Sequence, residues 1–450
     1  MPPLPDLFLF ERYAFDPASG ALELAYRYDG GGPAFTERLR FPPLTRPLSD
    51  PERAALETAL RLLFLLAGVS YAKAFMPRTL ACPAFPLDPV TAAFVEDVYR
   101  QGLAECAYRN GVDLDGRLVF QADALAAPPV GTPLPHLSRA LVPVGGGKDS
   151  TVTLEALRGA GEDITLFALG GPNGPAAPIR ATCEVAGLPL LSVQRVLSPN
   201  LAEVNHQEGA INGHIPITAI VSGAALITAL VQGFANVVLS NERSASAPNV
   251  IQGGHAVNHQ FSKSFAFESA LNAYVTRHIS PNLLYFSLLR PLSEAAIAKR
   301  FAALSRYHDV FRSCNTAFRQ NESKRASSWC GACPKCRFVF LALAPFMDKD
   351  RLIRIFGANL LDDPAQTAGF AALGGLDTHK PFECVGEEDE SRLLLAHLAR
   401  HPAWRDSSVV HALAPRLTFG GEEAFAERFQ ALFTPSWSES LVPERYRSLF

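Results

Sequence analysis

The stretch LVPVGGGKDST, residues 141–151, decides the fold of this chain. It starts as an apolar strand, continues with three glycines in a row and ends in residues that open a helix. Glycine has no side chain, so the backbone N–H groups of Gly145, Gly146 and Gly147 can point at an anion, and the helix behind them adds the positive end of its dipole. The stretch therefore predicts a phosphate-binding loop between a strand and a helix.

Two common phosphate loops do not fit these residues. A P-loop needs a hydroxyl residue directly after its lysine, and Asp149 stands there instead. A dinucleotide-binding fingerprint needs a third glycine at an offset where this chain has none. A different kind of phosphate loop is therefore required, and a glycine-rich turn without a ligand is the alternative.

The segment from Gly146 to Ser150 resembles the PP-loop of the ATP pyrophosphatases, whose pattern is Ser/Thr-Gly-Gly-x-Asp-Ser. That resemblance implies that ATP is a co-substrate and that its pyrophosphate is released on this loop while a substrate oxygen is adenylated. The residues it assigns to ATP and pyrophosphate are Gly145, Gly146, Gly147, Lys148, Asp149 and Ser150. Gly145 stands where the family has Ser or Thr, which removes one hydroxyl from the phosphate cage.

Short apolar runs alternate with helical patterns after residue 137: LVPV, ITLFALG, LLSVQRV and VVLS. This alternation predicts an α/β fold with a doubly wound parallel sheet, which the loop resemblance assigns to the PP-loop (adenine nucleotide alpha hydrolase-like) type. Pro143 lacks the N–H that a central strand uses, which leaves the end of its strand uncertain. Ligands of such sheets lie beyond the carboxyl ends of the strands, so the segments that follow these runs are the candidates for site residues.

Three units are expected along the chain: an N-terminal α+β domain at 1–136, a nucleotide-binding catalytic domain with the cysteine cluster at 137–345, and a mostly helical region at 346–450. Residues 7–41 alternate apolar and polar side chains, which predicts an antiparallel sheet. Asp50 is the predicted N-cap of a helix that runs through Leu66. The proline-rich segment 126–137 is the predicted linker.

Charge and composition exclude several classes of partner. A net charge of −3 with mixed signs offers no basic face for nucleic acid. The segment from His214 to Ser240 carries no Asp, Glu, Lys or Arg, but Pro216, Gln232 and Gly233 divide it into a predicted buried helix and a short strand, so no membrane span is expected. No export signal is visible, and the eight cysteines suit a reducing cytoplasm. The oligomeric state stays open.

Polar side chains gather after the later strands, in SNERSASAPNV (240–250) and NHQFSKSFAFE (258–268). Asn241 and Arg243 are candidates for the nucleotide phosphates, and Lys263 is a second cation that could neutralise a phosphate or a carboxylate. Asp149 and Glu242 are the candidate magnesium ligands, because Mg²⁺ takes oxygen ligands.

A second motif places Cys314 upstream of Cys330, Cys333 and Cys336 in two overlapping C-x-x-C steps. Such steps bring thiolates around one point, and four thiolates match the tetrahedral ligand set of structural zinc. An iron–sulfur cluster uses the same ligands, and a turn of free thiols is the third possibility. The sequence alone leaves these three open.

The combination of this loop with a downstream cysteine cluster resembles the 7-cyano-7-deazaguanine synthase branch of the pyrophosphatases. Over roughly residues 7–400 the chain is more similar to the MurL family of UDP-N-acetylmuramoyl-L-alanyl-L-glutamate epimerases. The segments that carry this similarity are VPVGGGKDS, SNERSA, NHQFSKSFAFE, WCGACPKCRFVFLALAPF and HKPFECVGE.

The similarity implies an ATP- and Mg-dependent inversion of the terminal L-glutamate of a UDP-muramoyl dipeptide, with AMP and pyrophosphate as products, in peptidoglycan synthesis. Adenylation neutralises the carboxylate, so an ordinary side chain can then remove the α-proton. The candidate bases are His206, His214, His255, His259, Lys263 and Cys384. Two alternatives remain: a ligase of the deazaguanine synthase or RNA-modification type, and a non-catalytic nucleotide-binding protein.

Overall fold

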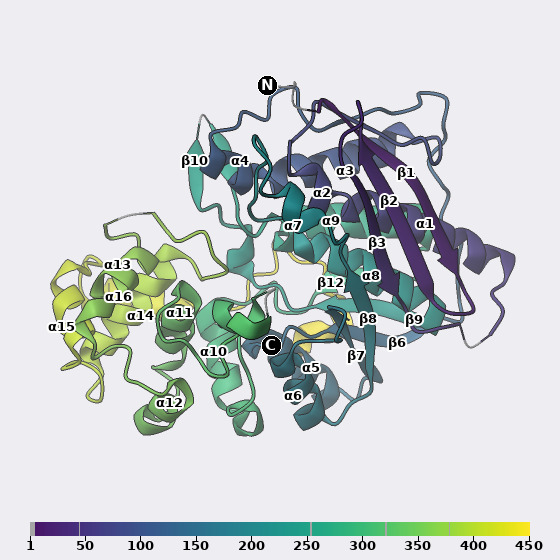
Figure 1. Cartoon of the computed structure of the whole chain (residues 1–450). Coiled ribbons are helices and arrows are strands. Elements are labelled where there is room, and N and C mark those ends of the chain that lie inside the picture. The colour runs from purple at the N-terminus through teal and green to yellow at the C-terminus, as the bar shows by residue number, and fades with distance from the viewer. Residues whose placement is uncertain (1–4, 45, 253, 320–321, 378) are drawn as a thin grey trace.

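The computed structural model describes residues 5–44, 46–252, 254–319, 322–377 and 379–450, and centres on one ten-stranded sheet (Figure 1). The strand order is β12-β9-β6-β7-β8-β3-β2-β1-β4-β5. The strands are β1 Leu7–Asp16, β2 Ala21–Tyr28, β3 Ala34–Arg40, β4 Thr79–Ala81, β5 Val119–Phe120, β6 Ser138–Pro143, β7 Ile164–Gly170, β8 Leu190–Val196, β9 Phe234–Leu239 and β12 Leu284–Ser287. A separate hairpin pairs β10 Val250–Gln252 with β11 His255–Val257.

The five strands β12, β9, β6, β7 and β8 run parallel to one another, which confirms the parallel core predicted from the alternating apolar runs. Residues on β6 alternate between two cores: Leu141 belongs to one, and Ala140 and Val142 to the other. The sheet is therefore covered on both faces. Pro143 pairs with Phe167 of β7 but lies beyond the last β6–β9 pair at Leu141, so its missing N–H interrupts no ladder on that side.

The N-terminal strands β1, β2 and β3 are antiparallel, as predicted, but they do not form a sheet of their own. Strand β3 pairs antiparallel with β8, so the N-terminal strands continue the parallel sheet. A buried ion pair holds this junction: Arg195 of β8 donates from Nε to Glu37 of β3 over 2.7 Å and from Nη2 over 2.9 Å. The predicted boundary at residue 136 therefore lies between two segments that contribute strands to one sheet. The limits of the three predicted domains stay a prediction.

Helix α1, Asp50–Ala67, confirms the predicted N-terminal helix, but its N-cap is Ser49 and the Asp50 assignment was wrong by one residue. The reason is a capping box: Ser49 Oγ accepts from the Glu52 N–H, and the Glu52 carboxylate accepts from the Ser49 N–H over 2.7 Å. Within the described residues, Asp50–Ala72 is long and apolar enough to cross a membrane, yet 83% of its apolar window is buried inside the fold. This burial shows that the segment belongs to the core of the fold.

The apolar segment after His214 forms the buried helix α8, Ile217–Gln232, followed by β9, as predicted. The other helices of the first 302 residues are α2 Val69–Ala72, α3 Pro89–Gly102, α4 Ala104–Asn110, α5 Lys148–Gly159, α6 Ala177–Ala186, α7 Leu201–Val204, α9 Phe265–Tyr274 and α10 Glu294–Ala302.

The C-terminal region is helical, as predicted, and forms the green and yellow body in Figure 1. It packs against α10, and its side chains complete the core that covers one face of the parallel strands. Its helices are α11 Pro334–Leu343, α12 Lys349–Phe356, α13 Thr367–Leu373, α14 Glu388–Arg400, α15 Ser408–Leu413 and α16 Glu422–Ala431.

Candidate active site

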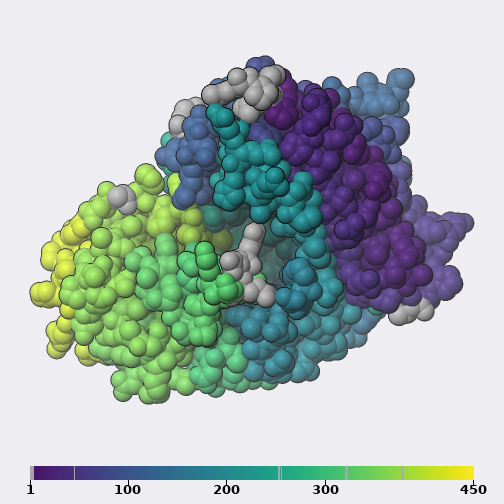
Figure 2. Space-filling model, in the orientation of Figure 1, coloured from purple at the N-terminus to yellow at the C-terminus, as the bar shows by residue number. Residues whose placement is uncertain are grey.

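A cavity of about 610 Å³ opens where β6 and β9 end, at the carboxyl edge of the parallel strands. Figure 2 shows the surface hollowed between the teal segments that carry the sheet and the green C-terminal segments. The walls of the cavity bring together predicted site residues from five segments of the chain: Gly145, Gly147, Asp149, Ser150, His214, Asn241, Glu242, His259, Lys263 and Cys384.

The triple-glycine loop has the backbone that its sequence predicts. Gly146 has a φ of +77°, in the left-handed region, and a Cβ there would lie 3.1 Å from the backbone N of Ile179. Helix α5 begins at Lys148 directly after the loop, so its N–H groups face the cavity edge. The Gly146 carbonyl accepts a 2.7 Å hydrogen bond from the N–H of Arg312, which helps to fix the loop. The loop therefore has the backbone geometry that an anion site at a helix N-terminus requires.

Lys148 does not line the cavity. Its ammonium is buried and makes ion pairs with Asp149 and with Glu294 of α10. Burial alone would lower the pKa of Lys148, but the two carboxylates outweigh it and raise that pKa above its usual value. Lys148 therefore anchors the start of α5 to α10, while the carboxylate of Asp149 still reaches the cavity.

The part of the wall that follows β9 contains Ser240, Asn241 and Glu242. Its backbone is held by Arg290, which is 1% exposed and donates to the carbonyls of Glu242 and Lys263, each over 2.6 Å. Glu268 balances the arginine charge across a 2.7 Å ion pair. One buried guanidinium thus sets the spacing between two segments that carry site residues.

Cys384 lies at the centre of a charged cluster on the cavity wall. Lys263 Nζ is 3.5 Å from Cys384 Sγ, and the His259 side chain also makes a hydrogen bond with that thiol. Behind His259, its Nδ1 contacts the carboxylate of Glu105, which Arg109 holds from the other side over 3.0 Å. The chain of contacts runs from a buried carboxylate through an imidazole to a sulfur that faces the cavity.

These contacts set the protonation states of the cluster. Burial opposes a thiolate, but the charges of Lys263 and Lys335 and the hydrogen bond from His259 outweigh it and lower the pKa of Cys384 to about 5. Burial likewise opposes an imidazolium, but hydrogen bonds to Cys384 and Glu105 raise the pKa of His259 to about 9. At neutral pH the pair is a thiolate beside an imidazolium.

The remaining predicted bases differ in position and charge. Burial and the nearby charges of His259 and Lys263 lower the pKa of His214 to about 3, so its ring is neutral in the cavity. The Cys384 thiolate raises the pKa of Lys263 above its usual value, so this lysine keeps its proton. His206 is exposed after α7 and does not line the cavity.

Two further predicted residues stand apart. His255 lies in β11, and its side chain lies outside the described residues. Arg243 starts a short 3-10 helix, where its N–H donates to the Leu292 carbonyl, and it is not part of the cavity wall.

The four cysteines of the second motif converge. The sulfurs of Cys314, Cys330, Cys333 and Cys336 all lie within 4.8 Å of one another. The Cys333–Cys336 and Cys330–Cys336 distances are 3.5 and 3.7 Å. Four thiolates around zinc at about 2.3 Å in a tetrahedron are about 3.8 Å apart, so the cluster fits one such ion. A multi-iron cluster places several atoms between its cysteines and suits thiolates that are further apart.

The cysteine cluster also reaches into the cavity. Ser313 and Asn315 flank Cys314, Lys335 lies between Cys333 and Cys336, and all three flanking residues line the cavity. Asn315 Nδ2 donates to the carboxylate of Glu383, next to Cys384. The sequence predicted a role for the cysteines but not for these three neighbours. The position of Lys335 between two cysteines of a C-x-x-C step could have indicated that it lies near a site. Glu105, from α4, gave no signal at all.

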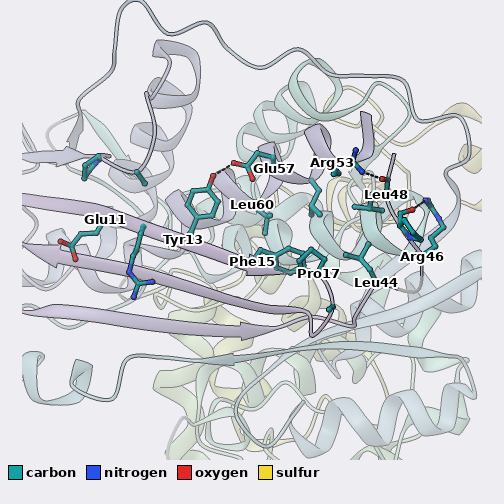
Figure 3. Close-up of a pocket in the computed structure, with 16 residues that line it drawn as sticks. Glu11, Tyr13, Phe15, Pro17, Leu44, Arg46, Leu48, Arg53, Glu57 and Leu60 are labelled. Atoms are coloured by element: carbon teal, nitrogen blue, oxygen red, sulfur yellow. Dashed lines mark hydrogen bonds between the residues drawn. The ribbon is translucent and has the colours of Figure 1, made fainter. Parts of the chain in front are cut away.

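A larger cavity, about 970 Å³, lies between β1 and α1 (Figure 3). Its floor is apolar, with Phe15, Leu44 and Leu60, and its rim carries a hydrogen bond between Tyr13 and Glu57. Burial, assisted by Glu57, raises the pKa of Tyr13 to about 12, so its hydroxyl stays protonated. The residues described along its wall include no histidine and no cysteine, in contrast to the cavity at the end of β6 and β9.

Comparison with known proteins places the chain among close relatives. A model of the MurL N-terminal domain matches residues 3–288, and one of the MurL C-terminal domain matches residues 310–427. A protein of Xanthomonas oryzae pv. oryzae is 48% identical over 406 residues, which are 90% of this chain and 88% of that protein. A Salinispora tropica protein is 45% identical over 444 residues, 98% of this chain and 94% of its own length.

A third relative, from a Micromonospora species, is 44% identical over 446 residues, 99% of this chain and 98% of its own length. All three relatives carry the name UDP-N-acetyl-alpha-D-muramoyl-L-alanyl-L-glutamate epimerase. With both family domains matched and this identity along nearly its whole length, the chain belongs to the MurL family.

Proposed function

We propose that this chain is an ATP-dependent epimerase that inverts the terminal L-glutamate of UDP-N-acetylmuramoyl-L-alanyl-L-glutamate to D-glutamate and releases AMP and pyrophosphate. Membership of the MurL family and the names of its relatives support the substrate. The observation that carries the mechanism is that one cavity joins the triple-glycine loop at the start of α5 to the charged cluster around Cys384. The reaction belongs to peptidoglycan precursor synthesis, and we place it in the cytoplasm, where ATP and UDP-linked precursors are made.

The chemistry of the reaction explains why the site needs both a phosphate-binding loop and a group that accepts a proton. An α-proton beside an ionised carboxylate is hard to remove, because the enolate would carry a second negative charge on the same group. Transfer of AMP to the carboxylate removes the first charge and makes the α-proton far more acidic. A side chain can then take that proton, and reprotonation from the other face followed by hydrolysis gives the D-residue.

On this proposal the loop of Gly145, Gly146 and Gly147 and the N-terminus of α5 receive the pyrophosphate of ATP as in a PP-loop, with Ser150 and Asn241 at its sides. Asp149 and Glu242 both line the cavity and offer the oxygen ligands that magnesium prefers. Magnesium, when bound there, would neutralise phosphate charge. Lys148 does not line the cavity and contributes through its buried ion pairs with Asp149 and Glu294.

The direct test supplies the purified protein with ATP, Mg²⁺ and the UDP-muramoyl L-Ala-L-Glu dipeptide in deuterated water. We expect AMP and pyrophosphate to form only with this substrate, and the D-glutamate product to carry deuterium at its α-carbon. ADP as the product, or D-glutamate without deuterium, would contradict the mechanism. AMP formation with heterocyclic carboxylates or RNA, and none with the dipeptide, would instead point to a ligase of the deazaguanine synthase type.

We also propose that Cys314, Cys330, Cys333 and Cys336 hold a structural zinc ion, because their mutual distances match a tetrahedral site. We expect about one zinc per chain by mass spectrometry of the native protein. The Cys333→Ser variant should lose most of this zinc and lower the Tm by about 5 °C or more, because such sites contribute directly to folding. A matched Cys183→Ser variant, buried in α6 away from the cluster, should retain the metal. Iron in place of zinc, or no metal in either protein, would refute the assignment.

A further inference from the structure

We propose that the Cys384 thiolate takes the α-proton of the activated glutamate from one face, and that Glu105 is the residue that positions His259 behind it. The inference rests on the epimerase function proposed above and names its base. Its foundation is geometric: Cys384 Sγ lies on the cavity wall that also contains the triple-glycine loop and His259, with Lys263 Nζ 3.5 Å away.

The charges of the neighbouring groups favour Cys384 over the other candidate bases. A base needs a free electron pair at the working pH, and both Lys263 and His259 keep their protons beside the thiolate. His214 is neutral, but its low proton affinity makes it a weak acceptor. The thiolate combines a free pair with a pKa near 5, and it faces the cavity.

The proposed step balances without any further reagent. The Cα–H bond of the glutamyl adenylate breaks and an S–H bond forms on Cys384. The electron pair of the broken bond moves into the enolate and places its charge on the acyl oxygen. The ammonium groups of Lys263 and Lys335, both on the cavity wall, can stabilise that charge. In the reverse direction the Cys384 thiol returns its proton to the same face.

Glu105 acts through His259 rather than on the substrate. Its carboxylate is 4% exposed and contacts His259 Nδ1, while Arg109 holds its other oxygen. This contact fixes the ring and leaves Nε2 for the sulfur. The side chains of Glu105, His214 and His259 also lie close enough to bind a cation. The positive charge of Lys263, which acts on His214, would repel a divalent cation there.

The first experiment measures alkylation of the full-length protein by iodoacetamide between pH 4 and pH 9, with peptide mapping to separate the cysteines. The charged groups around the sulfur are Lys263, His259, Lys335, Lys380 and Glu383. A lowered pKa leaves the thiolate present above it, so the Cys384 rate should rise near pH 5 and level off by about pH 7. Burial raises the pKa of Cys82 to about 11, so this half-buried cysteine serves as the internal control and should react only in alkaline solution.

Glu105→Gln should shift the alkylation midpoint of Cys384 upward, and Glu105→Asp should restore part of the shift, because the carboxylate stabilises the imidazolium that stabilises the thiolate. A purely structural role for Glu105 would change the stability of the protein and leave this midpoint in place. A midpoint for Cys384 that matches that of Cys82 in the wild-type protein would overturn the proposal.

The second experiment follows proton exchange in Cys384→Ala. We expect deuterium uptake from solvent into the α-carbon to fall about 10³-fold, and to fall at least 100-fold more than the exchange of labelled pyrophosphate into ATP. Cys82→Ser should keep both rates. Equal loss of both exchanges in Cys384→Ala, or a stable acyl group on Cys384 in the mass spectrum, would refute its role as a base. If the wild-type protein forms no AMP, the epimerase function itself fails, and the alkylation profile still tests the thiolate.

Discussion

Asp149→Asn is expected to reduce AMP formation about 10³-fold, a loss of about 4 kcal/mol of transition-state stabilisation. Asp149 is the acidic residue of the first turn of α5, and its carboxylate lines the cavity beside the triple-glycine loop. Asparagine keeps the size of the side chain but removes the charge that magnesium would need at the phosphates. The measurement is the release of AMP at saturating ATP and dipeptide, with magnesium varied.

The fold should survive this change, because Lys148 keeps its buried ion pair with Glu294. Circular dichroism and Tm should therefore match the wild-type protein within a few degrees. Asp406→Asn is the matched control, since the Asp406 side chain is 87% exposed in the C-terminal region. Retention of more than about a tenth of the wild-type rate by Asp149→Asn would contradict a metal or phosphate role for Asp149.

Arg290→Met is expected to lower the free energy of unfolding by about 3–5 kcal/mol, because it leaves the Glu268 carboxylate buried without its partner. It also frees the carbonyls of Glu242 and Lys263, which Arg290 holds in place. Urea titration followed by fluorescence measures the first effect, and AMP formation the second. We expect the activity to fall even at urea-free, low-temperature conditions where the protein stays folded.

A double variant separates charge from architecture. Adding Glu268→Gln to Arg290→Met should restore part of the lost stability, because the unpaired charge is gone while Gln still accepts from the Ser287 N–H. Activity should stay low, because the carbonyls of Glu242 and Lys263 still lack the hydrogen bonds from Arg290. Arg405→Met, with a side chain that is 60% exposed, is the surface control and should change neither quantity. A fully active Arg290→Met protein would show that the spacing of the two segments does not matter.

The sequence predicts well those features that are encoded locally. The triple glycine, the start of α5 and the cysteine cluster each depend on residues close in the chain, and each has the predicted geometry. The parallel strands were equally visible, because each is a short apolar run with turn residues after it. The N-cap of α1 was misplaced by one residue because Ser49 and Asp50 are both good capping residues, and only the reciprocal bond with Glu52 decides between them.

The sequence could not predict contacts between distant segments. Glu105 lies 154 positions before His259, in a part of the chain that was assigned to a separate domain. Arg290 looks like any arginine until its burial between two loops is known. Lys148 belongs to the loop motif, but its inward turn depends on Glu294, which comes from a helix 146 positions later. In each case the partner is chosen by the packing of elements and not by a local pattern.

The junction between β3 and β8 limits how this protein can be divided. Three residue pairs and the Glu37–Arg195 contact close it, and Tyr71 and Ser70 supply the remaining hydrogen bonds to those charges. If the polypeptide were cut near residue 136, β3 and β8 would each become an unpaired edge strand, and Glu37 and Arg195 would each lose their partner. Unpaired edge strands and unpaired charges favour aggregation. The fragments should therefore be soluble only when produced together, and a foreign module grafted in place of the first 136 residues would have to bring its own acid for Arg195.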